Sequence, residues 1–207
     1  MRVTLTDWLT CPSCGPAEGL VVLAERLESR QVIEGALGCP ACQRQYPIRS
    51  GMADLRIQSS GEAAGFEPAC GSDADPVRLG ALLGITEGRG LVVLLGGAAT
   101  HAGALAGMMP GLEIIAVGAH AASEAGAESV SRISADAVLP LRDGSVRGVV
   151  LDADMPNRLQ REAVRVLAIG GRLVISRAAA DAEEIARVNA LREDARDANH
   201  IVVTRVH

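Results

Sequence analysis

Short apolar runs alternate with helical segments along the chain after residue 76. The clearest run, 91–95, leads directly into Gly96 and Gly97 and then into small residues. An apolar run that ends in glycines is typical of a buried parallel strand that turns tightly into a helix. Further strands are predicted at 112–117, 130–133, 146–152, 172–176 and 201–206, and helices at 76–85, 159–167 and 181–196.

This alternation predicts an α/β fold with a doubly wound, mostly parallel, Rossmann-like sheet and helices on both faces. Such sheets bind ligands at the carboxyl ends of their strands, where glycines let the backbone approach the ligand and a helix begins. Only one strand is visible after 172–176, so the predicted sheet is short. The expected domain is 77–207, and 57–76 has the Ser, Gly and Pro content of a linker.

Residues 1–56 follow a different pattern and form a small β unit. Two Cys-X-X-Cys pairs, Cys11/Cys14 and Cys39/Cys42, are separated by 24 residues, and two short apolar runs between them predict strands. So small a unit buries too little apolar surface to be stable alone. Four thiolates on one zinc ion contribute on the order of 10–16 kcal/mol in peptides. A closed shell of four cysteines is structural and not catalytic, so the sequence predicts a structural zinc ribbon.

Two other interpretations of the cysteines are open. Disulfides are typical of secreted chains, and an N-terminus with Asp7 followed by two cysteines is not a signal peptide. A redox Cys-X-X-Cys usually occurs singly, near a βαβ unit. Cys70, in the linker, is expected to be a free thiol. Loss of a ligand such as Cys39 is expected to unfold the ribbon and leave 76–207 folded.

The amino-acid composition and the net charge exclude some classes of function. Hydrophobic residues make up 48% and charged residues 22%, which is typical of a globular protein. The net charge of −5 argues against general nucleic-acid binding, because phosphate contacts need a basic surface. No apolar run approaches the roughly 18 residues that span a bilayer, so we expect no membrane association and a cytoplasmic location.

The ribbon resembles a known family. Residues 9–14 (LTCPSC) and 37–55 (LGCPACQRQYPIRSGMADL) are similar to the zinc-ribbon family of small methyltransferase-activator proteins. The shared pattern is a second knuckle followed by Tyr-Pro-Ile, a basic residue, Gly and a hydrophobic segment. The resemblance implies edge-strand pairing with a methyltransferase. We therefore expect a protein partner or a homo-oligomer.

The larger part resembles class I S-adenosylmethionine-dependent methyltransferases. Residues 134–146 (SADAVLPLRDGSV) and 162–175 (EAVRVLAIGGRLVI) carry the resemblance, which covers about 76–176. It implies S-adenosylmethionine as the cofactor, bound by Gly96, Gly97, Asp136 and Ala137. In this family the acid at Asp136 usually contacts the adenine amine.

Several cofactor residues of that family are replaced here. Leu94 stands in place of the acid of the first strand, and Gly118 in place of the acid that binds the ribose. Ala98 and Thr100 stand where glycines are usual, and we expect their Cβ atoms to crowd the turn. Binding of S-adenosylmethionine is therefore predicted to be weak. A hydrogen bond to a charged group contributes roughly 1.5–3 kcal/mol.

The predicted function is a pseudoenzyme or protein-binding scaffold. One alternative is an active methyltransferase with a divergent pocket, and another is a binder of a different nucleotide or small metabolite. No catalytic residue is assigned. Asp152 and Asp154 follow the fourth strand, where family members often place reacting groups, but they are interpreted as caps of the next helix.

Overall fold

The structure is a computed structural model, and it describes residues 1–57, 75–85, 89–118, 129–136, 138–151, 156–176, 185 and 190–207. The linker 57–76 lies almost entirely outside these residues, as do Cys70, Ala137, Asp152 and Asp154. None of the helices in the described ranges is long and apolar enough to cross a membrane.

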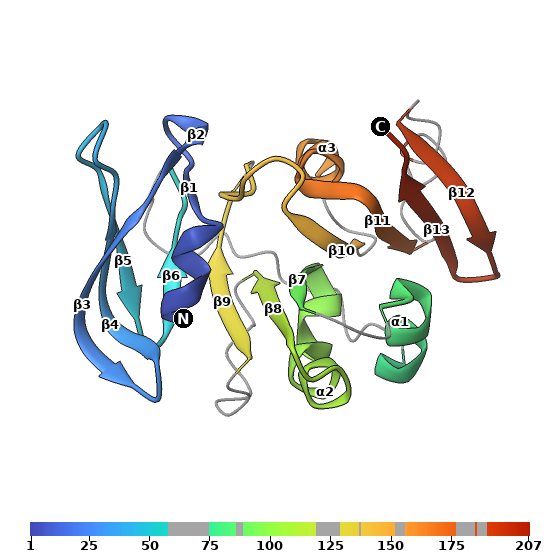
Figure 1. The fold of residues 1–207 in the computed structure, drawn as a ribbon, viewed down its shortest axis with the longest axis horizontal. Helices are drawn as coiled ribbons and strands as arrows, with labels where there is room; N and C mark the ends of the chain where they lie inside the picture. Colours follow the sequence, from blue (N-terminus) through green and yellow to red (C-terminus); the bar gives the residue numbers. More distant parts are fainter. Residues whose placement is uncertain are drawn as a thin grey trace.

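The N-terminal unit is built mainly of antiparallel strands (Figure 1). Both strands expected between the two cysteine pairs are present, and the sheet continues past the second pair. Its elements are η1 (Val3–Asp7), β1 (Thr10–Cys11), β2 (Gly15–Gly19), β3 (Val21–Glu28), β4 (Gln31–Gly38), β5 (Gln45–Arg49) and β6 (Met52–Asp54).

The second part is the predicted Rossmann-like sheet. Its elements are α1 (Pro76–Leu83), β7 (Gly90–Leu95), η2 (Gly96–His101), α2 (Ala102–Met108), β8 (Leu112–Val117), β9 (Val130–Ser134), β10 (Val146–Leu151), α3 (Asn157–Val166), β11 (Leu167–Ser176), β12 (Leu191–Arg196) and β13 (His200–Arg205). The strand order is β12-β13-β11-β10-β7-β8-β9. Strands β7 to β11 are parallel, and the order reverses between β7 and β10. The predicted fold class is confirmed.

One predicted element is wrong. Residues 191–196, expected to end a helix over 181–196, form strand β12, which pairs antiparallel with β13. Two strands therefore follow β11, and the sheet is not short. The sequence LREDAR contains good helix formers. It lacks apolar alternation because β12 is an exposed edge strand. Pairing with β13 overrides the local helix propensity. Of the rest of that predicted helix, only residues 185 and 190 lie in the described part.

The two parts share one sheet. Strand β6 of the ribbon pairs in parallel with β9, which joins the ribbon strands and the Rossmann strands into an 11-stranded sheet. The paired residues are Met52 with Arg132, Ala53 with Ile133 and Asp54 with Ser134. The Leu55 N–H continues this ladder by donating to the Ser134 carbonyl at 2.9 Å. The sheet is therefore continuous from β3 at one edge to β12 at the other (Figure 1).

Two aliphatic cores lie on the two faces of this sheet. Helices α1 and α2 cover one face, where Leu79, Leu83 and Leu105 pack on Val92 and Leu94. The other face is covered by α3 and by the ribbon, whose buried side chains belong to the same cluster as those of α3. That cluster is a single core, to which both halves contribute: Leu5, Leu9, Cys11, Leu37, Tyr46, Ile48, Val93, Ile133, Leu141, Leu159 and Ala163. The ribbon and α3 therefore stabilise the same face.

Gly35 allows the ribbon strands to approach closely. It has φ +151°, and a Cβ there would meet the Leu23 carbonyl oxygen and Ala24 Cα. We expect Gly35→Ala to lower the free energy of unfolding by about 1–3 kcal/mol, because the clash is with backbone. The control is Gly107→Ala, in α2, where a Cβ meets open space and stability should rise by about 0.5–1 kcal/mol. Denaturant unfolding measures both. Equal stability of Gly35→Ala and the wild type would contradict the close approach of β3 and β4 at this glycine.

Candidate metal centre and cofactor edge

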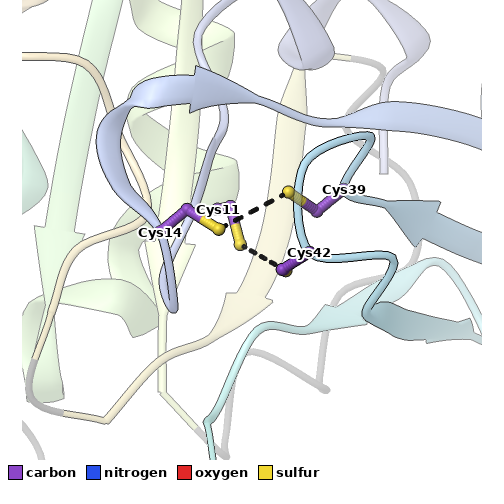
Figure 2. Close-up of side chains that lie close together, drawn as sticks. All are labelled: Cys11, Cys14, Cys39 and Cys42. Atoms are coloured by element: carbon purple, nitrogen blue, oxygen red, sulfur yellow. Dashed lines mark hydrogen bonds between the residues drawn. The ribbon is translucent and has the colours of Figure 1, made fainter.

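The first cysteine pair lies in the turn between β1 and β2. Cys11 ends β1 and pairs with Gly15, the first residue of β2. Gly15 has φ +100°, a left-handed conformation that glycine adopts without strain. The residues between them reverse the chain, so that the thiols of Cys11 and Cys14 both face the second pair (Figure 2).

The second pair lies in the turn between β4 and β5. The Cys39 N–H donates to the Arg44 carbonyl, and the Gln43 N–H donates back to the Cys39 carbonyl, both at 2.9 Å. Gln43 has φ +60°, which closes the turn directly after Cys42. These bonds fix the positions of the Cys39 and Cys42 thiols. The strands that flank both turns belong to the ribbon, so its fold brings the two pairs together.

The four sulfurs form one compact cluster (Figure 2). Cys11 Sγ is 3.7 Å from Cys42 Sγ, Cys14 Sγ is 3.9 Å from Cys39 Sγ, and all four lie within 4.8 Å of one another. Four sulfurs at about 2.3 Å from a tetrahedral zinc ion would lie about 3.8 Å apart. A disulfide needs about 2.05 Å, and all four cysteines are free. The donor set therefore fits a tetrahedral zinc ion.

The surroundings of the cluster shift the pKa values of two of its thiols in opposite directions. Burial raises the pKa of the Cys11 thiol, but hydrogen bonds from Tyr46 and from the N–H groups of Cys14 and Ser13 outweigh it and lower the pKa to about 7. The hydrogen bond with Cys42, followed by desolvation, raises the pKa of Cys14 to about 12. The Cys11 thiolate therefore forms more readily than that of Cys14, whose pKa the charge on Cys11 helps to raise. A divalent cation among the sulfurs would relieve this repulsion.

The predicted cofactor residues lie along the carboxyl ends of β7, β8 and β9. Gly96 and Gly97 follow β7, Gly118 follows β8, and Asp136 lies two residues beyond β9. Parallel pairing of these three strands places their ends at the same edge of the sheet. Ala137 lies outside the described residues.

The glycine turn differs in one respect from what the sequence suggested. Gly96 has φ +70°, as expected of a tight turn, and the chain enters η2 before α2. The Ala98 side chain is buried in the core formed with α1 and α2. Thr100 is exposed, and its hydroxyl donates to the Gly97 carbonyl at 2.6 Å. Of the two side chains expected to crowd the turn, Ala98 is therefore buried and Thr100 is exposed.

The two positions at which the family resemblance implies an acid, Leu94 and Gly118, have different environments. Leu94 is fully buried beside Val92, Ala98 and Leu105, and belongs to the core. Gly118 has φ +138°, and its N–H donates to the Ile133 carbonyl at 3.2 Å. Among the described residues, no atom lies within 4 Å of a Cβ built at Gly118, and the backbone conformation there is one that other residues rarely adopt.

Asp136 is exposed, and it accepts a hydrogen bond from the residue that directly follows the ribbon. Its Oδ2 accepts the Ile57 N–H at 3.2 Å. Arg56 donates to both oxygens of Asp54, at 2.7 and 2.6 Å, and these bonds lower the pKa of that carboxyl group. Sequence reasoning did not assign a role to Asp54 or Arg56, because their proximity to Asp136 depends on the β6–β9 pairing.

The segment after Asp136 is held from two sides. On the ribbon side, the Thr10 N–H donates to the Pro140 carbonyl at 2.9 Å, and the Arg142 N–H donates to the Trp8 carbonyl at 3.1 Å. On the helix side, Arg165 of α3 donates to the carbonyls of Leu139 and Leu141, at 2.7 and 2.9 Å. Thr10 directly precedes Cys11, so the first cysteine turn borders the segment that follows Asp136.

Comparisons with known proteins agree with both halves of this structure. Residues 2–51 match the sequence model of the Trm112p-like protein family. The fold resembles a chain of the complex between the Haloferax volcanii Trm112 methyltransferase activator and a putative methyltransferase, with a TM-score of 0.50 and 16% identity over 61% of this chain and 88% of that one. An S-adenosylmethionine-dependent methyltransferase from Aquifex aeolicus has a TM-score of 0.48 and 16% identity over 63% and 88%. No curated protein matches the chain.

The chain therefore joins a Trm112p-like segment to a domain with the fold of S-adenosylmethionine-dependent methyltransferases. Both resemblances inferred from the sequence are confirmed. At 16% identity, the structural comparison establishes the fold alone.

The cysteine cluster predicts a metal content. We expect about one zinc ion per chain in protein purified without a tag, because the four sulfurs have tetrahedral spacing. Cys39→Ser should lose the metal, and Cys70→Ser, which changes the fifth cysteine, should keep it. Elemental analysis measures the metal. Since Cys39 lies in the core shared with α3, we expect Cys39→Ser to lower the thermal midpoint of the whole chain, and not of 1–56 alone. Metal-free wild-type protein of unchanged stability would contradict the assignment.

Proposed function

We propose that this chain is a methyltransferase-like scaffold without catalytic activity, stabilised by a structural zinc ion at Cys11, Cys14, Cys39 and Cys42. The observation that carries the proposal is the composition of the carboxyl ends of β7 and β8. Leu94 and Gly118 occupy the places of the two acids there, and Leu94 is part of the hydrophobic core. A buried leucine at that place supports a structural use of the strand end and offers a cofactor no carboxylate there.

The ribbon of this proposed scaffold acts in cis. The Haloferax volcanii complex contains a Trm112 methyltransferase activator and a putative methyltransferase. In this chain, the Trm112p-like segment is covalently linked to the methyltransferase-like domain and packed on it through β6, β9 and the shared core. We infer that the ribbon supports the fold of its own Rossmann half and holds the segment after Asp136.

An active methyltransferase with a divergent pocket is the second candidate. Asp136 is the observation that favours it, because this acid is retained, exposed and held at the carboxyl edge by the Ile57 N–H. Gly96 and Gly97 also keep the tight turn that a cofactor would need. Both candidates have the same ribbon and the same sheet. What distinguishes them is the affinity of the chain for S-adenosylmethionine.

Cofactor affinity is the decisive measurement. We expect calorimetric titration of the full chain with S-adenosylmethionine to give a Kd from high micromolar to millimolar; a Kd of 1 mM corresponds to about −4 kcal/mol. Gly118→Asp should raise the affinity less than tenfold, because it strains the backbone at φ +138° and leaves position 94 without a carboxylate. Asp136→Asn serves as the comparison that removes the retained acid. Low-micromolar binding, or cofactor retained through purification, would favour the active enzyme.

We also propose that the chain pairs with a protein partner or a second copy through edge strand β3. Val21, Leu23 and Leu27 are about half exposed there, whereas the opposite edge, β12, is mostly charged. Free edges with apolar side chains pair readily with other strands.

Light scattering should show a defined oligomer, and Leu23→Arg should reduce it to a monomer. Ile169→Arg, at an exposed residue of β11, is the control. A strictly monomeric wild type would contradict self-association.

A further inference from the structure

Tyr46 has a buried hydroxyl group next to the cysteine cluster. It lies in β5, four residues after Cys42, and its side chain is only 4% exposed. Its Oη is 3.4 Å from Cys11 Sγ and 3.0 Å from Ser13 Oγ. The ring packs in the shared core, which fixes the direction of the hydroxyl group. A phenylalanine would fill the same space without either hydrogen bond.

The direction of these bonds follows from the chemistry of a metal ligand. A cysteine that ligates a cation is a thiolate, so its sulfur can only accept a hydrogen bond. The Tyr46 hydroxyl must then donate to Cys11 Sγ, which leaves its oxygen to accept a bond from the Ser13 hydroxyl. Ser13 lies between Cys11 and Cys14, so the chain of bonds from Ser13 through Tyr46 to Cys11 starts and ends within the same cysteine turn.

We propose that Tyr46 is a positioning residue of the zinc centre, which holds the Cys11 thiolate by a hydrogen bond and is itself oriented by Ser13. The inference rests on the zinc centre proposed above. Groups that hydrogen-bond to metal ligands set the orientation of those ligands, and their loss typically costs 10–100-fold in metal affinity. Tyr46 therefore acts through Cys11 and does not contact the metal.

The test compares full-length Tyr46→Phe with the wild type. Competition with a chromophoric chelator should show zinc affinity about 10–100-fold weaker in the variant. In cobalt-substituted protein, the sulfur-to-cobalt charge-transfer absorption should shift, because one thiolate has lost its hydrogen bond. Ser13→Ala should shift both measurements in the same direction by less. Ser145→Ala is the matched control, since that exposed hydroxyl donates to a backbone carbonyl elsewhere in the fold.

The possible outcomes of this test distinguish the role of Tyr46 from the existence of the zinc centre. Zinc affinity within twofold of the wild type, with an unchanged cobalt spectrum, would overturn the role of Tyr46 and leave the zinc centre standing. Wild-type protein that binds neither metal would overturn both. If Tyr46→Phe does not fold, Ser13→Ala decides, because it leaves the buried ring in place and removes only the bond that orients the hydroxyl group.

Discussion

The parallel pairing of β6 with β9 is the contact on which the rest of the structure depends. It is only three residue pairs long, yet it sets the position of the whole ribbon relative to the Rossmann sheet. With that register in place, η1 and the first cysteine turn lie over the same face of the sheet as α3. A shift by one residue would exchange the two faces of β6 and turn buried Ala53 away from the core. The pairing and the shared core therefore support each other.

The proposed zinc ion and the shared core both stabilise the ribbon. The zinc ion acts within the ribbon, and the core acts between the ribbon and the Rossmann half. A ribbon of this size buries little apolar surface, and the cysteine cluster ties the β1–β2 turn to the β4–β5 turn. The core then ties the ribbon to α3, with Leu9 and Leu141 paired at the boundary. Cys11 and Cys39 belong to both systems, because they are cluster members and buried core residues. Metal loss would consequently disturb the packing of the Rossmann half, including the segment after Asp136.

Patterns that reflect burial could be read from the sequence, and features set by long-range pairing could not. Strands β7, β8 and β10 are buried on both faces, so their apolar runs marked them almost to the residue. The cysteine spacing likewise located the cluster, since each pair lies within one turn. Strand β12 was missed because its side chains are mostly charged and its conformation comes from pairing with β13. The contact of Ile57 with Asp136 was missed because 79 residues separate them and only the β6–β9 register brings them together.

The burial of Leu94 limits which side chains the carboxyl end of β7 can hold. An aspartate there would place a carboxylate among Val92, Ala98 and Leu105, and an unpaired buried charge is strongly destabilising. At Gly118, by contrast, no atom of the described residues would meet a Cβ, and a side chain there would strain the local backbone. The two replacements are thus unequal: the second could be reversed alone, but the first is built into the packing of α1 and α2 against the sheet. A chain with an acid at position 94 would need a different core around it. The proposed scaffold function therefore rests on the packing of Leu94 in the core, as well as on the residues at the carboxyl ends of the strands.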